Sequence, residues 1–347
     1  MPDDANPRKR ARTDRNDEGP GADATYTRGD LWYDDGNIIL IAEDGVGFRV
    51  YKGILSQWSE VFRDMFTVPQ PVDAEKWEGC AVVHLSDSSC SLIRVLRILF
   101  ADENALFKRP VPFETVAAML QLGTKYQIHH LRQEAIGRLE IYFPLRLQDF
   151  KNRFGSDWEG RVPGDGNFFP RVHDTIDDVA EDDIWTTIVL ARALDVPALL
   201  PPSFYLAAQC LTPDVFREHI DEDGVRWSLS SDDIQRIIVG QEALRKRSIE
   251  FLDYFTDAPS PNCVERRTCA KELRSVRRDQ LTEAHYDTSA LIHATWVKNS
   301  DLCSTCIDYF VSHYEEERTK TWSELAVYFE LKEVEWPVTD STEDQTS

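Results

Sequence analysis

Four cysteines near the C-terminus are the residues in this sequence whose type and spacing best suit chemistry. They form two pairs, Cys263-x5-Cys269 and Cys303-x2-Cys306, with 33 residues between the pairs. Two thiolates separated by two residues converge at a tight turn, and two such pairs complete a tetrahedral four-sulfur site for Zn²⁺. Because a structural zinc contributes folding free energy directly, such a site would organise the segments that carry it. We therefore predict one structural zinc, held by Cys263, Cys269, Cys303 and Cys306.

Other interpretations of these cysteines stay open. The first pair has five intervening residues where two to four are usual, so His285, His293 or His313 is an alternative ligand. One alternative is that the four cysteines are free reduced thiols in a helical domain, which is the commoner state of cysteine inside cells. A redox pair at Cys303 and Cys306 would be expected beside a βαβ pattern, which the sequence does not show.

A basic stretch follows the first cysteine pair. Its side chains at helical spacing of three and four are Arg267, Lys271, Arg274 and Arg278. One face of a helix would carry them, and such a face suits contact with phosphates. Acidic residues interleave, so we favour a solvated helix face or an internal clamp for an acidic linker.

The sequence has no other pattern that indicates catalysis. It contains no G-x-S-x-G, no GxxxxGK, no HExxH and no complete GxGxxG. We therefore predict a protein that is not an enzyme and that needs no cofactor besides the zinc.

The composition predicts a folded protein whose negative charge disfavours binding to nucleic acid. The chain has 347 residues, of which 42% are hydrophobic, and this is enough for two ordinary domains. The formal net charge of −22 repels nucleic acid in general, so we expect no direct nucleic-acid binding. No run approaches the roughly 20 apolar residues that span a bilayer, and no secretory signal opens the chain. We expect an intracellular protein, nuclear or cytoplasmic, without membrane contact.

Residues 1–28 read as a disordered tail that is polar and rich in Asp, Arg, Pro and Gly. Within it lies a compact basic cluster, the kind that importins read as a nuclear address: Arg8, Lys9, Arg10 and Arg12. The alternative is a solvated charge run without function.

Residues 29–143 read as an α+β unit, and the rest of the chain as mainly α. Short apolar runs predict three strands near residues 38–42, 48–51 and 81–85, and at least five helices follow the 3.6-residue period. Residues 144–182 are rich in Gly, Pro, Asp and Asn and predict a linker or insert. Helical periodicity returns over 183–336, and 337–347 read as a second disordered tail.

Five blocks of the N-terminal half resemble the BTB/POZ domain. They are residues 32–40, 48–55, 59–66, 83–87 and 125–128, beginning with Trp32-Tyr33-Asp34-Asp35-Gly36. The likeness covers about residues 30–143 and is closest to the BTB proteins of mushroom-forming (basidiomycete) fungi, where it extends through the C-terminal region.

This resemblance implies a short sheet flanked by helices and a homodimer formed through the first helix and strand. It places Phe48, Leu55, Phe62 and Met65 in the domain core. We expect the apolar run Leu31-Trp32-Tyr33, which precedes the first predicted hairpin, to lie in the dimer interface. The function implied is a protein–protein interaction scaffold that binds itself and a further protein partner.

Two alternatives accompany this function: a nuclear transcription or chromatin-associated regulator, and a substrate adaptor of a cullin-type ubiquitin ligase. The sequence departs from the family pattern at two relevant places. Asn37 stands where several members have an Asp that pairs with the basic residue matched by Lys52. The segment Thr115-Val116-Ala117 lacks the apolar-x-acidic motif of many cullin adaptors.

Overall fold

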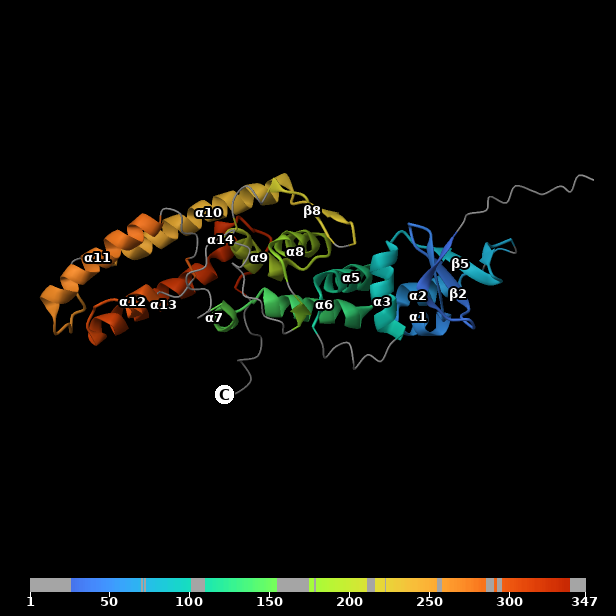
Figure 1. Ribbon diagram of the computed structural model, residues 1–347, viewed down its shortest axis with the longest axis horizontal. Helices are drawn as coiled ribbons and strands as arrows, with labels where there is room; N and C mark the ends of the chain where they lie inside the picture. The colour runs from blue at the N-terminus through green and yellow to red at the C-terminus, as the bar shows by residue number, and fades with distance from the viewer. Residues whose placement is uncertain are drawn as a thin grey trace, which may run out of the picture.

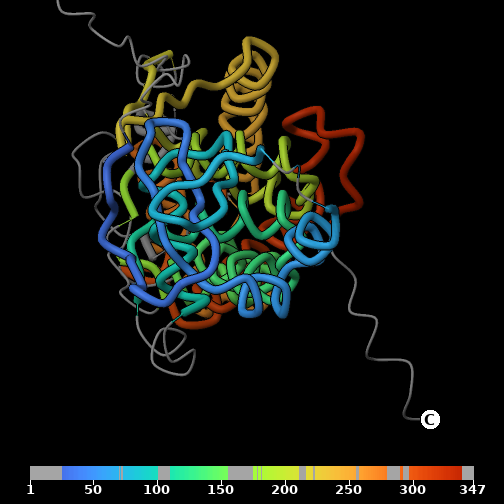
Figure 2. The backbone as a smooth tube through the Cα atoms, turned by 90° about the vertical axis from the view of Figure 1, so that its right-hand side faces the viewer, coloured from blue at the N-terminus to red at the C-terminus, as the bar shows by residue number. Residues whose placement is uncertain are grey.

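The computed structural model describes residues 26–69, 71, 73–100, 110–154, 175–177, 179–210, 216–221, 223–254, 258–284, 290–291 and 295–337. The molecule is elongated, with a small sheet at one end and the C-terminal helices at the other (Figure 1). Viewed along its long axis from the sheet end, the strands lie in front of the helices (Figure 2).

The sheet has five strands in the order β1-β3-β2-β5-β4. Their bounds are β1 (Thr27–Trp32), β2 (Ile38–Ile41), β3 (Val46–Val50), β4 (Lys76–Trp77) and β5 (Cys80–His84). β2 and β3 form the predicted hairpin, whose turn places Gly45 at φ +81°, a conformation that favours glycine. β1 runs parallel to β3, and β5 parallel to β2. The sheet is therefore mixed, and it contains the three predicted strands plus β1 and β4 at its edges.

The side chains of alternate residues in β2 point to opposite faces of the sheet, as the two-residue period of a strand requires. Ile38 and Leu40 join the main hydrophobic core with the flanking helices. Those helices are α1 (Lys52–Trp58), α2 (Glu60–Thr67), α3 (Ser89–Phe100), α5 (Phe113–Lys125) and α6 (His129–Tyr142). Ile39 and Ile41 face the opposite side, where they are covered by large aromatic side chains, including Trp32 and Trp77.

The C-terminal region is mainly helical, as predicted. Its helices are α7 (Leu147–Phe154), α8 (Glu181–Ala193), the 3₁₀ turn η1 (Pro197–Leu199), α9 (Leu200–Ala207), α10 (Ser231–Leu252), α11 (Arg266–Ala284), α12 (Thr295–Lys298), α13 (Ser304–Ser323) and α14 (Leu325–Tyr328). Two short strand pairs accompany them: β6 (Val111–Pro112) with β7 (Ile176–Asp177), and β8 (His219–Ile220) with β9 (Arg226–Trp227). None of the described helices combines the length and apolar character needed to cross a membrane.

Two boundaries differ from those that the sequence predicts. β1 begins at Thr27, inside the range read as a tail, because Thr27 and Arg28 pair with β3. The range read as a linker contains α7, whose Phe150 and Phe154 are buried in the main core.

The main core is continuous between the two halves of the chain. It joins side chains of the sheet and α5 to those of α8, α9, α10 and α14 in one cluster. An ion pair adds to this junction: Arg94 of α3 donates to both carboxylate oxygens of Asp223 in the β8–β9 turn, at 3.0 and 2.9 Å. The helical region is therefore packed against the sheet-containing half as one body.

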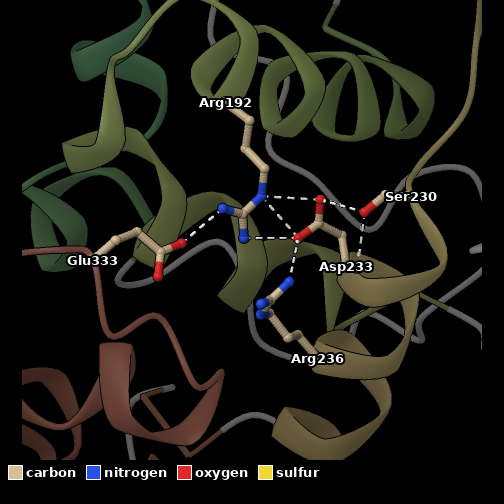
Figure 3. Close-up of polar contacts among 5 residues, drawn as sticks. All are labelled: Arg192, Ser230, Asp233, Arg236 and Glu333. Carbon is tan, nitrogen blue, oxygen red and sulfur yellow. Dashed lines mark hydrogen bonds and ion pairs between the residues drawn. The ribbon is translucent and has the colours of Figure 1, made fainter.

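An ionic network around the buried Asp233 fixes the start of α10 (Figure 3). The guanidinium of Arg192, in α8, lies between Asp233 and Glu333 and donates to them at 2.8 and 2.7 Å. The Ser230 hydroxyl accepts the backbone N–H of Asp233 and so caps α10, while Arg236 donates to the same carboxylate. Three segments distant in sequence are thereby held together.

A second, smaller core lies in the helices farthest from the sheet (Figure 1). Between the two cores runs a polar layer that joins α7, α10 and α13. In it, Arg247 donates to Thr321 at 3.2 Å and pairs with Glu317, and Lys151 pairs with Glu315 at 2.5 Å. The part of α10, α11, α12 and α13 around the smaller core is called the distal module below.

Candidate metal centre

The four cysteines predicted to bind zinc meet in the distal module. Cys263 lies in the loop between α10 and α11, and its N–H donates to the Ser260 carbonyl at 3.0 Å. Cys269 lies in the first turns of α11. Cys303 is the residue before α13, and Cys306 lies in its first turn. Two loop–helix junctions therefore deliver one pair of cysteines each.

The sulfur atoms are spaced as a tetrahedral centre requires. All four Sγ atoms lie within 4.8 Å of one another, and those of Cys263 and Cys303 are 3.7 Å apart. Zn–S bonds of about 2.3 Å in a tetrahedron place the sulfurs about 3.8 Å apart. A disulfide needs about 2.05 Å, and all seven cysteines are free. The arrangement can therefore hold a metal ion, and its donor set of four thiols is the one that structural zinc prefers.

Backbone N–H groups point at three of the sulfurs. Cys303 N–H donates to Cys269 Sγ at 3.4 Å. Glu265 N–H donates to Cys263, and Cys306 N–H donates to Cys303. Such donors stabilise thiolates and orient them, as the outer shell of a metal site does.

The thiols differ in how readily they ionise. The N–H of Cys306, at the start of α13, lowers the pKa of Cys303 to about 7. Burial raises the pKa of Cys263 to about 12 and also raises that of Cys269. The Cys303 thiolate thus forms readily near neutral pH, whereas Cys263 and Cys269 need a nearby cation to offset the cost of a buried charge.

Apolar side chains enclose the cluster. Cys269 and Cys306 are fully buried, and Cys263 and Cys303 complete the same small core. The described apolar neighbours include Phe251, Leu252, Leu273, Val297, Leu302, Phe310 and Tyr314. A core of this size gains relatively little from hydrophobic burial, so a metal would contribute a large share of its stability.

Of the three histidines named as alternative ligands, His313 lies in the described part of the chain and is not a member of the cluster. His313 packs its ring against Tyr254 and Tyr309. His285 and His293 lie outside the described residues. Ser260 is the polar neighbour that the sequence did not indicate: its hydroxyl lies 3.5 Å from Cys306 Sγ.

The residues expected in the core and in the dimer interface lie at the sheet end. Phe48, Leu55 and Phe62 are buried in the main core, and Met65 packs half-buried against it. Leu31 and Tyr33 are half-buried against the same core. Trp32 packs edge-on against Trp77, with ring centroids 4.9 Å apart. The predicted interface residues are therefore partly covered within one chain.

Asn37 and Lys52, where the sequence departs from the family's charged pair, make a local contact. The Asn37 amide oxygen accepts the backbone N–H of Lys52 at 2.8 Å, at the start of α1. The Lys52 ammonium instead lies over the ring of Phe66. The basic cluster Arg8, Lys9, Arg10 and Arg12 lies outside the described residues.

Comparison with known proteins agrees with the fold at the sheet end. Residues 34–139 match the family model of the BTB/POZ domain. This range begins after β1 and ends within α6, so it contains the β2–β3 hairpin, β4, β5 and the helices packed on them. No match was found among curated proteins. The chain therefore carries a BTB/POZ domain, a protein-interaction fold, followed by a largely helical region.

Proposed function

We propose that this chain is a non-enzymatic interaction scaffold that self-associates through its BTB/POZ domain and presents its helical region to a protein partner. The match of residues 34–139 to the BTB/POZ domain carries the proposal, because that domain is a protein-interaction fold. The elongated shape adds to it, since the sheet and the distal module lie at opposite ends (Figure 1).

The edge of the sheet supports self-association through β1. β1 is an edge strand, so one row of its backbone N–H and C=O groups has no partner strand among the described residues. Leu31, Trp32 and Tyr33 are each half-buried and keep apolar surface beside this edge. Pairing with a second copy would satisfy the backbone groups and cover that surface.

Light scattering of the full-length protein tests the proposal. We expect a mass twice the 39.9 kDa of one chain. Hydrogen exchange at high and low concentration locates the contact: β1 should gain protection as the dimer forms. β4 is the matched control, because it is the opposite edge of the same sheet. A monomer mass at tens of micromolar, or equal gains at β1 and β4, would contradict association through β1.

A structural zinc in the distal module is the second part of the proposal. The four-thiol donor set, the sulfur spacing and the three backbone donors support it. With zinc bound, the cysteines would tie the α10–α11 loop to the start of α13. The metal would serve stability and would take no part in catalysis.

A nuclear role is the alternative that a specific observation favours. Arg8, Lys9, Arg10 and Arg12 form a basic cluster in an otherwise acidic protein. Replacing Lys9 and Arg10 by Ala in a fluorescent fusion should move the protein toward the cytoplasm. An unchanged distribution would remove the support for this alternative.

A further inference from the structure

The four clustered cysteines differ in how exposed their side chains are. Cys269 and Cys306 are 0% exposed, and they are called the inner pair below. Cys303 is half-buried, and Cys263 is 9% exposed in a loop whose adjacent residues on both sides are exposed. Cys263 and Cys303 are called the outer pair. Their sulfur atoms are therefore the two that a small molecule in solution reaches first.

The backbone around the outer pair is also less constrained. Cys263 lies in the loop between α10 and α11, and Cys303 immediately precedes α13, so neither residue is inside a helix. The inner pair, in contrast, is carried by α11 and α13 themselves. The outer sulfurs are 3.7 Å apart, and a disulfide bond of about 2.05 Å requires them to approach by about 1.7 Å. Adjustment of the loop alone provides a movement of that size.

Zinc binding would keep both outer sulfurs in their reactive form. A thiol loses its proton when it binds zinc, and the thiolate is the form that peroxides oxidise. An oxidised thiolate becomes a sulfenic acid, which condenses with a thiol beside it to form a disulfide. Cys303 is the more accessible sulfur, and Cys263 is the neighbour within reach.

We propose that the outer pair is a redox modification site, at which a hydroperoxide converts Cys263 and Cys303 to a disulfide and expels the zinc. The accessible position of Cys303, its contact with Cys263 and the loop backbone of both residues carry the proposal. It rests on the zinc centre proposed above and concerns the regulation of that site.

The reaction takes two steps. The Cys303 thiolate attacks one oxygen of hydrogen peroxide, the O–O bond breaks, and hydroxide leaves a sulfenic acid on Cys303. The Cys263 thiolate then attacks that sulfur, so that the S–S bond forms, the S–O bond breaks and a second hydroxide leaves. The two sulfurs lose two electrons to the peroxide, and two protons convert the hydroxides to water. The inner thiolates take up two further protons as zinc departs.

The disulfide would replace the metal as the link between two segments. Loss of two thiolates leaves only the inner pair, which is too few ligands for a structural zinc with four. The new bond joins the α10–α11 loop to the start of α13, the same segments that the zinc would tie. The distal module therefore keeps one covalent link after its zinc is expelled.

Peroxide treatment of the zinc-loaded full-length protein tests the site. A chromogenic chelator follows zinc release, and mass spectrometry of alkylated peptides identifies the disulfide. With a roughly tenfold excess of hydrogen peroxide, we expect a disulfide between Cys263 and Cys303 of one chain to form in step with zinc release. Reduction with dithiothreitol in the presence of zinc should restore the metal.

Cys90 is the internal control. It is half-buried like Cys303, but its polar neighbours are Ser89 and Asp223 and not a second thiol. Cys90 should remain reduced at the peroxide dose that releases zinc. Cys303→His supplies a matched variant, because histidine is a zinc ligand that cannot form a disulfide. Its zinc release should be at least about fivefold slower than that of the wild type.

Several results would overturn the proposal. They are zinc that stays bound while Cys90 is oxidised, zinc release without the outer disulfide, a disulfide between two chains, and equally fast release from Cys303→His. If that variant holds no zinc, the disulfide map of the wild type decides alone. Protein without zinc before treatment refutes the zinc centre and this proposal with it. Bound zinc that peroxide does not release refutes the redox site and leaves the zinc centre standing.

Discussion

Arg94 and Asp223 form a two-point ion pair across 129 positions of the sequence. Arg94 lies in α3 of the BTB/POZ domain, and Asp223 lies in the β8–β9 turn of the helical region. Their side chains are 21% and 12% exposed, so solvent screens the pair only in part. This contact and the continuous core couple the BTB/POZ domain to the helices that follow it.

Loss of the Asp223 carboxylate should therefore destabilise the whole chain. Asp223→Asn leaves the half-buried Arg94 without its charged partner, and we expect a loss of about 1–3 kcal/mol in the free energy of unfolding. Glu218→Gln is the control on the same hairpin, because the exposed Glu218–Arg226 pair should contribute less than about 0.5 kcal/mol. Urea unfolding measures both, and equal midpoints would contradict the role of the ion pair.

The contact between Gly240 and Phe329 gives a second stability test. A Cβ on Gly240 would lie 2.0 Å from the fully buried Phe329 ring, so Gly240→Ala should cost roughly 2 kcal/mol or more. Gly137, in α6, has nothing within 4 Å of the same position. Gly137→Ala should instead stabilise by about 0.5–1 kcal/mol. Thermal unfolding that ranks the two variants the other way would contradict this packing.

Asp183 should make stability depend on pH near neutrality. Burial raises its pKa to about 7, the nearby carboxylate of Glu114 acts in the same direction, and the N–H of Ala180 opposes the shift. A raised folded-state pKa means that the stabilisation is present at low pH and is lost as pH rises through about 7. We expect Asp183 to account for a loss of about 1 kcal/mol between about pH 6 and pH 8.

Asp183→Asn isolates this effect from the titration of histidines. The amide keeps an acceptor for Ala180 N–H and cannot ionise, so its unfolding free energy should vary less between pH 6 and pH 8 than that of the wild type. Chemical denaturation at both pH values gives the comparison. Identical pH profiles for the two proteins would show that Asp183 does not titrate in this range.

The sequence predicted the domain and the cysteine cluster because both depend on local signals. The continuous apolar run Ile38–Ile41 indicated a buried strand, and the spacing of Cys303 and Cys306 indicated a pair of thiols that could bind a metal together with the second pair. β1 and β4 escaped prediction because Thr27–Trp32 is largely polar and Lys76–Trp77 has only two residues. These strands exist through pairing with the strands beside them.

Contacts between distant segments could not be read from the sequence. The Arg94–Asp223 pair depends on how the β8–β9 turn packs against α3. The hydrophobic periodicity of the sequence predicts single helices and strands but does not predict how such distant segments pack. The range predicted as a linker was dominated by Gly, Pro and Asp, which hid the two buried phenylalanines of α7, Phe150 and Phe154. The main core that joins the BTB/POZ domain to the helical region likewise depends on how the helices pack, so the sequence alone did not predict it.

Loss of one cysteine ligand should unfold the distal module without unfolding the main core. Cys306→Ser removes much of a zinc-binding free energy that is roughly 10 kcal/mol or more in small zinc domains. The polar layer at Arg247 and Glu317 separates the two cores, so we expect hydrogen exchange to accelerate in α11 and α13 and to change little in the BTB/POZ domain. Cys90→Ser, outside the cluster, is the control. Equal exchange in both variants would contradict a zinc-dependent module.

Metal analysis of the full-length protein, purified without chelators, tests the zinc centre most directly. The geometry of Cys263, Cys269, Cys303 and Cys306 predicts about one zinc per chain, and Cys306→Ser should lose it while Cys90→Ser keeps it. Wild-type protein with less than about 0.2 zinc per chain, or an equal zinc content in Cys306→Ser, would contradict the zinc centre on which the distal module is proposed to depend.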